Sequence, residues 1–295
     1  MSAEERPAAL VTPTDWRRPG VRLGLGGAQV LLLAALVVVG LGPILWLAKS
    51  AITPTADTIG HPMALFPHGS AWSNLREAWV EVDVGRYFWN TVVLAVGSWL
   101  VQIVVATTGG YALSVLRPSY AKVINALRLM TLFVPAVVLL VPLYIEIVHP
   151  PIVHHSLIDS YWAVWLPAGA SAFNVIIVKR FFDNLPREIF EAARIDGAGP
   201  IQQFLHVTIP HLRRILLIVA LVFTLFNFNN FDLIYLTTQG GPLDRTMTLP
   251  VKTYEVAFKG LQVGLSSAMA VIMLTLLALI SICYLNYVRI TSDSK

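Results

Sequence analysis

The chain has 295 residues, of which 56% are hydrophobic and 13% are charged, and its mean hydropathy is +0.68. A soluble domain carries roughly 25% charged residues, so the composition argues against a soluble enzyme, a disordered chain or a secreted disulfide scaffold. The single cysteine, Cys283, excludes an intrachain disulfide framework and a cysteine-rich metal site. The net charge of +4 is spread along the chain, which favours a membrane protein over a nucleic-acid-binding protein.

Six stretches are long and apolar enough to cross a bilayer, because about 20 residues rising about 1.5 Å each are needed for roughly 30 Å of hydrocarbon. The predicted spans are residues 28–47, 90–112, 129–148, 161–178, 215–236 and 266–287. We therefore expect an all-α fold, a polytopic membrane protein with six transmembrane helices. The first span is expected to be an uncleaved helix, since its apolar core is longer than the roughly 7–15 residues of a signal peptide.

Lysine and arginine are distributed unevenly between the segments that connect these spans. The first set comprises residues 1–27, 113–128, 179–214 and 288–295. The second set comprises residues 48–89, 149–160 and 237–265. The first set holds 15 Lys and Arg and the second holds 6. By the positive-inside rule the first set is cytoplasmic, which predicts a multi-pass protein of a bacterial cytoplasmic (inner) membrane with both termini in the cytoplasm.

Three prolines, Pro135, Pro142 and Pro167, lie within the predicted third and fourth spans. A proline inside a helix removes a backbone donor and kinks the helix, so the freed carbonyl groups need a neighbouring helix or a cavity. Bundle packing accounts for any one of them, but together they favour helices that surround a space.

No source of energy for transport is visible in the chain itself. Ion-coupled carriers place ionisable side chains within the membrane, and the middles of the six predicted spans contain none. The phosphate-binding G-x-x-x-x-G-K-[ST] loop and the H-E-x-x-H metalloprotease motif are both absent from the sequence. His149, His154 and His155 near Glu146 could hold a metal ion, but a solvated loop is the preferred interpretation. We assign no catalytic residue, metal ligand or cofactor to this chain, so a partner must supply the energy.

Residues 179–214, the longest internal cytoplasmic segment, are predicted to contain two short helices. Gly197 is expected to end the first helix in a left-handed conformation. Gly199-Pro200 is expected to begin the second helix and Pro210 to end it. An alanine pair beside Glu191 gives the first helix a surface that suits docking into a cleft of another protein. The alternative is an amphipathic linker on the lipid headgroups.

The spacing of this segment resembles the E-A-A loop of ABC importer permease subunits, whose pattern is E-A-A-x-x-x-G-x(9)-I-x-L-P. The matching residues are Glu191-Ala192-Ala193, then Gly197, then Val207-Thr208-Ile209-Pro210, with Val and Ile in place of Ile and Leu. The string from Phe181 to Ala198 is especially similar to carbohydrate importers of the maltose-permease type. Tyr87-Phe88-Trp89-Asn90-Thr91 resembles one of the two maltose-type subunits. The Asn229–Tyr235 segment followed by Gly240-Gly241-Pro242 resembles the other, so the subunit type stays open.

The resemblance implies a six-helix subunit, two of which form a channel, with an ATPase dimer beneath, which binds ATP and Mg²⁺, and an extracytoplasmic solute-binding protein above. It divides the chain into an N-terminal tail (1–27), a first helix with an outer segment (28–88), a permease core (89–287) and a C-terminal tail (288–295). It assigns ATPase coupling to Glu191, Ala192, Ala193, Asp196, Gly197 and Pro210. The expected solute is a sugar or an oligosaccharide.

Polar side chains in the membrane are candidates for the solute path, because amides are costly against lipid. The candidates are Asn174, Asn227, Asn229 and Asn230. Asn227, Asn230 and Ile234 would share one helical face at i, i+3 and i+7. The alternative, which is at least as well supported for each residue, is that these amides join helices together.

Two alternatives stay open for the function. The first is a permease of the same mechanical type for another solute, such as a peptide, phosphate or a polyamine. The second is a channel or a membrane-embedded enzyme, which requires the likeness of the loop to be accidental.

Overall fold

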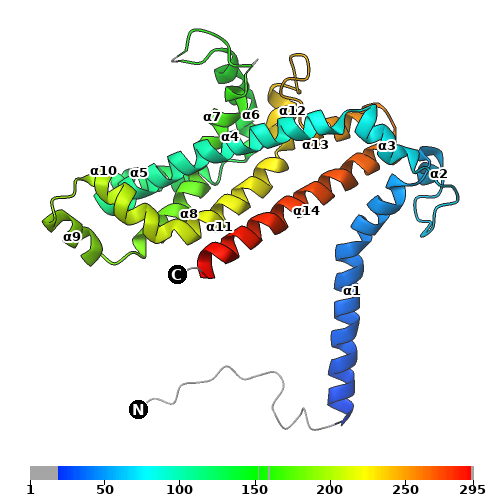
Figure 1. Cartoon of the computed structure of the whole chain (residues 1–295), viewed down its shortest axis with the longest axis horizontal. Helices are drawn as coiled ribbons and strands as arrows, with labels where there is room; N and C mark the ends of the chain where they lie inside the picture. Colours follow the sequence, from blue (N-terminus) through cyan, green and yellow to red (C-terminus); the bar gives the residue numbers. More distant parts are fainter. Residues whose placement is uncertain (1–18, 152, 159, 294–295) are drawn as a thin grey trace.

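The computed structural model describes residues 19–293 except 152 and 159, and all of its regular elements in this range are helical. Most of the predicted N-terminal tail and the last two residues lie outside the described part. Four helices are long: α1 (Pro19–Ala51), α4 (Val84–Tyr111), α11 (Ile209–Phe228) and α14 (Val263–Asp293). Figure 1 shows α4, α11 and α14 running along the length of the molecule.

Three helical segments within the described residues are long and apolar enough to cross a membrane: Leu23–Ala51, Val84–Leu116 and Val263–Arg289. They contain the predicted first, second and sixth spans. Two bent helix pairs bring the number to at most five. The all-α membrane fold is thus confirmed, whereas the six-span arrangement is not.

The predicted third span is not one helix. It divides into α5 (Ala121–Thr131) and α6 (Ala136–Val148), which are separated by turns over residues 132–135. Pro135 stands at the start of α6, where its missing N–H breaks the backbone ladder and its ring disfavours a helical residue before it. The 13 residues of α6 rise about 20 Å at 1.5 Å each, which is short of the bilayer core.

The predicted fourth and fifth spans are also interrupted. In the fourth, α7 (Trp162–Gly169) and α8 (Ala172–Asp183) meet at 48°, and the Ser171 hydroxyl caps α8 by accepting from the backbone N–H of Asn174. In the fifth, α11 ends at Phe228 and α12 (Phe231–Thr237) begins after two asparagines.

The remaining elements are short. They are α2 (Thr55–Gly60), α3 (Ser73–Val80), α9 (Glu188–Ile195), α10 (Pro200–Gln202), α13 (Leu249–Tyr254) and the π-helical turns η2 (Ala112–Leu116), η3 (Gln203–Thr208) and η4 (Glu255–Lys259).

Helix α4 lies at the centre of the body and packs against α7, α8 and α11. Glycines allow the close approach: a Cβ on Gly97 of α4 would stand 2.1 Å from Trp165 of α7, and one on Gly169 would stand 2.6 Å from Val101. Small residues at crossing points are typical of helix pairs in lipid, where dispersion contacts replace the hydrophobic effect.

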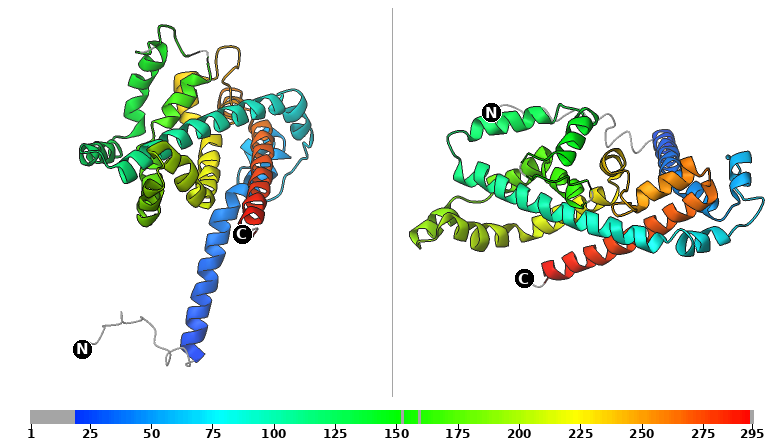
Figure 2. Two further views of the ribbon diagram at one scale, coloured as in Figure 1. Left: turned by 60° about the vertical axis from the view of Figure 1, so that its left-hand side comes forward. Right: turned by 90° about the horizontal axis from the view of Figure 1, so that it is seen from above.

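Helix α1 stands apart from this body. Its buried side chains in the described part are Ser50 and Ala51, at its C-terminal end beside α14. Figure 1 and the left view of Figure 2 show the rest of α1 extending away from the other helices. Because α1 is apolar on all sides, its surface is suited to lipid or to another membrane-embedded chain.

Candidate coupling loop and solute path

Helix α9 ends as the sequence predicts. Gly197 has φ +81°, and the backbone N–H groups of Gly197 and Ala198 donate to the carbonyls of Arg194 and Ala193 at 3.0 and 2.9 Å. This pair of hydrogen bonds is the Schellman arrangement, in which a left-handed residue closes the helix. Nothing lies within 4 Å of a Cβ built on Gly197, so the glycine is needed for its backbone conformation and not for space.

One side of α9 is fixed to the body. Phe190 is buried in a cluster with Tyr111 of α4, Phe182 of α8 and Leu212 of α11, and Ile189 packs at its edge. Since this cluster joins three helices, the position of α9 is coupled to theirs.

The opposite side of α9 is open to solvent. Glu191, Ala192 and Asp196 are exposed, Ala193 is half-buried, and Ile195 is 87% exposed. Neither Glu191 nor Asp196 forms an ion pair with another described residue. This side of α9 therefore presents small, acidic and apolar side chains to solvent.

The second half of the loop differs from the prediction. Pro210 does not end the second helix: α10 continues through η3 into α11, and Pro210 lies in the first turn of α11. Pro210 has no N–H to donate to the preceding turn, and the turn before it is π-helical, with wider i→i+5 hydrogen bonds. Gln203, which is 3% exposed, secures the start of this half by donating from its amide to the Ala198 carbonyl at 2.7 Å.

Tyr111 connects the loop to the central helix. Its hydroxyl donates to the Pro200 carbonyl at 3.0 Å, and its ring lies edge-on to Phe204 at 5.1 Å. A displacement of the loop therefore acts directly on α4. No sequence pattern indicates this contact, which joins residues 89 positions apart.

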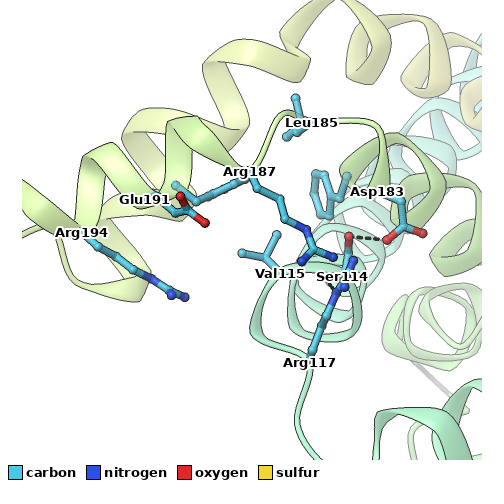
Figure 3. A pocket seen from close by; sticks show the side chains of 10 residues that line it. Ser114, Val115, Arg117, Asp183, Leu185, Arg187, Glu191 and Arg194 are labelled. Carbon is cyan, nitrogen blue, oxygen red and sulfur yellow. Dashed lines mark hydrogen bonds between the residues drawn. The ribbon is translucent and has the colours of Figure 1, made fainter.

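A cavity of about 170 Å³ lies beside α9, lined by residues of η2, α8, α9 and the segments that connect them. Figure 3 shows Arg117 and Arg187 pointing toward Ser114. The Ser114 hydroxyl donates to Asp183 at 2.6 Å, and Lys179 pairs with the same carboxylate at 2.6 Å. The Ser114–Asp183 hydrogen bond thus joins η2 to the C-terminal end of α8 beside the loop, and Lys179 supports the carboxylate from within α8.

The four candidate asparagines do not lie on one surface. Asn174 and Asn227 are 8% exposed, Asn229 is exposed, and Asn230 is half-buried at the start of α12. The helical face expected for Asn227 and Asn230 is wrong, because the helix breaks between them.

Asn227 forms a reciprocal pair with Gln102 of α4. The Asn227 amide donates to Gln102 Oε1 at 3.0 Å, and the Gln102 amide donates to Asn227 Oδ1 at 3.3 Å. Asn227 also donates to the carbonyl of Phe223 at 2.7 Å. This is the arrangement expected for an amide that joins two helices.

The segment Tyr87–Thr91 at the start of α4 contacts residues 244–249, which follow Gly240-Gly241-Pro242 in the chain. Asn90 of α4 donates to the carbonyls of Asp244 and Met247, at 3.2 and 3.1 Å, and the Tyr87 hydroxyl donates to the Asp244 carboxylate at 3.0 Å. The Thr91 hydroxyl accepts from the backbone N–H of Leu249 at 2.9 Å. The first residues of α4 therefore hold the loop between α12 and α13 in place through these hydrogen bonds.

An aromatic strip, made of Phe231, Tyr235, Tyr254 and Phe258, runs along α12, α13 and η4. Phe231 and Tyr235 are stacked with ring centroids 5.0 Å apart, and Tyr254 lies 5.0 Å from each of them and 4.9 Å from Phe258. Phe258 is 69% exposed, and the other three rings are half-buried. Sequence reasoning missed Tyr254 and Phe258, although their i, i+4 spacing matches that of Phe231 and Tyr235.

His149, His154 and His155 are exposed, and among the described residues they form no group of three metal-ligating side chains.

Residues 106–290 match the family described as binding-protein-dependent transport system inner membrane component. The chain is 29% identical over 203 residues to the diacetylchitobiose uptake system permease protein NgcG of Streptomyces coelicolor, a match that covers 68% of this chain and 63% of NgcG, less than two thirds of its length. It is 26% identical over 231 residues to the lactose transport system permease protein LacG of Rhizobium radiobacter, covering 78% of this chain and 81% of LacG.

The fold is similar to that of a chain in the crystal structure of a bacterial ABC transporter involved in import of the acidic polysaccharide alginate. The TM-score is 0.74 at 18% identity, covering 92% of this chain and 98% of that chain. The chain therefore belongs to the family of binding-protein-dependent transport system inner membrane components, and it is a permease subunit and not an enzyme.

Proposed function

We propose that this permease subunit forms half of the translocation channel of an ATP-driven importer for a sugar or an oligosaccharide, and that α9 docks on a separate ATPase. The observation that carries the proposal is the two-sided character of α9. Phe190 fixes one side to three helices, while Glu191, Ala192 and Ile195 are presented to solvent.

Three partners are proposed from the two-sided character of α9 and from the family. The ATPase dimer binds ATP and Mg²⁺, and this chain holds neither. A second, related permease subunit completes the channel, and an extracytoplasmic solute-binding protein delivers the solute. The excess of Lys and Arg in the segments on the α9 side supports the proposal that this side and both termini are cytoplasmic.

In the proposed mechanism, ATP closes the ATPase dimer and draws two docked loops together. ATP can bias the channel only through contacts that differ between its two states. Here the contact is α9, and its movement reaches α4 through Phe190 and Tyr111. Hydrolysis then returns the channel to its inward-facing state.

The docking proposal is tested with the complete transporter in lipid nanodiscs. Glu191→Arg places a long cation where a small acidic surface should enter the ATPase, and Gly197→Pro removes the left-handed residue that ends α9. We expect both variants to insert into the membrane and to lose solute-stimulated ATP hydrolysis. Lys122→Glu, a charge reversal on an exposed residue of α5, is the matched control and should keep it. Normal uptake by Glu191→Arg would refute docking at α9.

The sugar proposal is supported by the relatives and by the aromatic strip. NgcG and LacG are permeases of diacetylchitobiose and lactose systems, and flat aromatic faces beside water suit sugar rings. We expect Tyr254→Leu to raise the KM of uptake with little change in basal ATP hydrolysis. Phe133→Leu, at an 85% exposed aromatic position in the turn before α6, should leave uptake unchanged.

The class of solute is tested by competition. We expect unlabelled oligosaccharides to compete for uptake, and a peptide, inorganic phosphate or a polyamine to have no effect. Competition by one of these three alone would replace the sugar proposal while leaving the docking proposal intact.

A further inference from the structure

Three side chains between α1 and α3 converge on one point. Asp57 lies in α2, and His61 and His68 follow it in the chain. The Nδ1 atoms of both histidines lie 3.2 Å from the same oxygen, Oδ1 of Asp57. The three potential donor atoms all lie within 4.8 Å of one another. It is the one group of three or more His, Cys, Asp or Glu side chains with such spacing in the part of the chain that the structure describes.

The backbone holds this convergence in place. The N–H of His68 donates to Oδ2 of Asp57 at 3.0 Å. From α1, the Trp46 indole donates to the Pro62 carbonyl at 2.8 Å, and the Lys49 ammonium donates to the Ala64 carbonyl at 2.9 Å. The two histidines are therefore presented by a segment that is fixed at several points, which lowers the entropic cost of binding a ligand.

The donor set and its exposure suit a cation. One carboxylate and two imidazoles are ligand types that divalent transition metals accept. The two histidine side chains are 64% and 63% exposed, so an ion from solution can reach them.

We propose that Asp57, His61 and His68 bind a divalent transition-metal ion of the Zn²⁺ type. Zn–N and Zn–O bonds of about 2.0–2.2 Å in a tetrahedron separate the donor atoms by about 3.3–3.5 Å. Both imidazole-to-carboxylate separations are already 3.2 Å, and the donor atoms of the two imidazoles, which lie within 4.8 Å of each other, would move onto the ion. Two imidazoles and one carboxylate favour Zn²⁺, Co²⁺ or Ni²⁺ over Mg²⁺ and Ca²⁺, which prefer oxygen ligands. Water fills the fourth position.

The bound ion closes the segment between the two histidines into a loop. Its tip carries Met63, Leu65 and Phe66, which are 91%, 86% and 81% exposed. Because the ion joins both ends of this loop to α2, it holds these apolar side chains in one arrangement at the surface.

The test uses the full-length chain in nanodiscs, purified with a tag that contains no histidine and stripped with a chelator. Zn²⁺ is titrated by calorimetry, and Co²⁺ is followed by its visible absorption, which reports tetrahedral nitrogen and oxygen ligands. We expect one Zn²⁺ per chain and no heat with Mg²⁺. His61→Ala and His68→Ala should each weaken binding by more than the ~10–100-fold that the loss of an outer-shell partner causes.

The control is the double substitution His154→Ala and His155→Ala, which removes two exposed histidines of the other cluster and should leave the affinity unchanged. Asp57→Asn keeps the size of the side chain and should also weaken binding, so the proposal can be tested even if a histidine variant unfolds. Equal Zn²⁺ affinity of the parent chain, His61→Ala and His68→Ala would overturn the proposal and leave a cluster held by hydrogen bonds alone.

Discussion

The Gln102–Asn227 pair allows a quantitative test of what a membrane-embedded amide does in this fold. Both side chains are at most 9% exposed, and the structure gives the Gln102 amide no other partner among the described residues. Asn227→Leu therefore leaves the Gln102 amide unpaired at both its nitrogen and its oxygen. Gln102→Leu leaves only Oδ1 of Asn227 unpaired, because the Asn227 amide nitrogen keeps its bond to the Phe223 carbonyl.

Each unpaired buried group costs about 1–3 kcal/mol, so both single changes destabilise the chain and Asn227→Leu has the larger effect. In Gln102→Leu/Asn227→Leu no unpaired amide is left. The double variant should therefore lose less stability than the two single variants together. Polar pairs between membrane helices have coupling energies of about 0.6 kcal/mol on average and about 1.7 kcal/mol at most, and we expect a value in the upper part of this range.

The assay is a double-mutant cycle on equilibrium unfolding in mixed micelles, with helix content as the readout. Asn229→Leu serves as the control, since Asn229 is exposed and bonds within its own helix to the Leu225 carbonyl at 3.1 Å. Single effects that add without coupling would refute the interpretation of the pair as a link between helices. The KM of uptake is measured on the same variants. A changed KM in the double variant, at restored stability, would place Asn227 on the solute path.

Three further predictions concern close packing and the coupling loop. Gly97→Ala should destabilise the chain by about 1–3 kcal/mol through overpacking against Trp165, whereas Gly109→Ala, with its nearest neighbour at 3.4 Å, should have a much smaller effect in the same unfolding assay. Gly197→Ala should cost about 1–2 kcal/mol from left-handed backbone strain alone, and an unchanged unfolding midpoint would contradict this reason. Tyr111→Phe should remove about 0.5–1.5 kcal/mol of hydrogen bonding to Pro200, visible as faster amide exchange over residues 198–203 without faster exchange in α14.

Local chemistry predicted the parts of the fold that depend on neighbouring residues. The spans in α1, α4 and α14 follow from uninterrupted apolar runs. The end of α9 follows from one glycine, whose φ of +81° confirms the expected left-handed conformation.

The breaks could not be predicted in the same way. Pro135 was visible in the sequence, but whether a proline kinks a helix or ends it depends on whether neighbours satisfy the freed carbonyls. The break at residues 229–230 has no proline. Pro210 was expected to stop a helix, but the helical segment runs past it and bends by 75° between Arg213 and Ile215.

The contacts that define the candidate sites were the least predictable. Gln102 and Asn227 are 125 residues apart, and Asn90 and Met247 are 157 apart. Such pairs depend on how the helices cross, which periodicity within one helix does not determine.

The isolation of α1 has a consequence for the assembly of the transporter. The matched family region begins at residue 106, well after this helix. The C-terminal end of α1 is held by α14 and by hydrogen bonds from Trp46 and Lys49 to the segment that follows it, whereas the N-terminal turns bury no side chain in the described part. The N-terminal turns of α1 thus offer their apolar surface to lipid or to another membrane-embedded chain, and they should accept another apolar sequence of equal length.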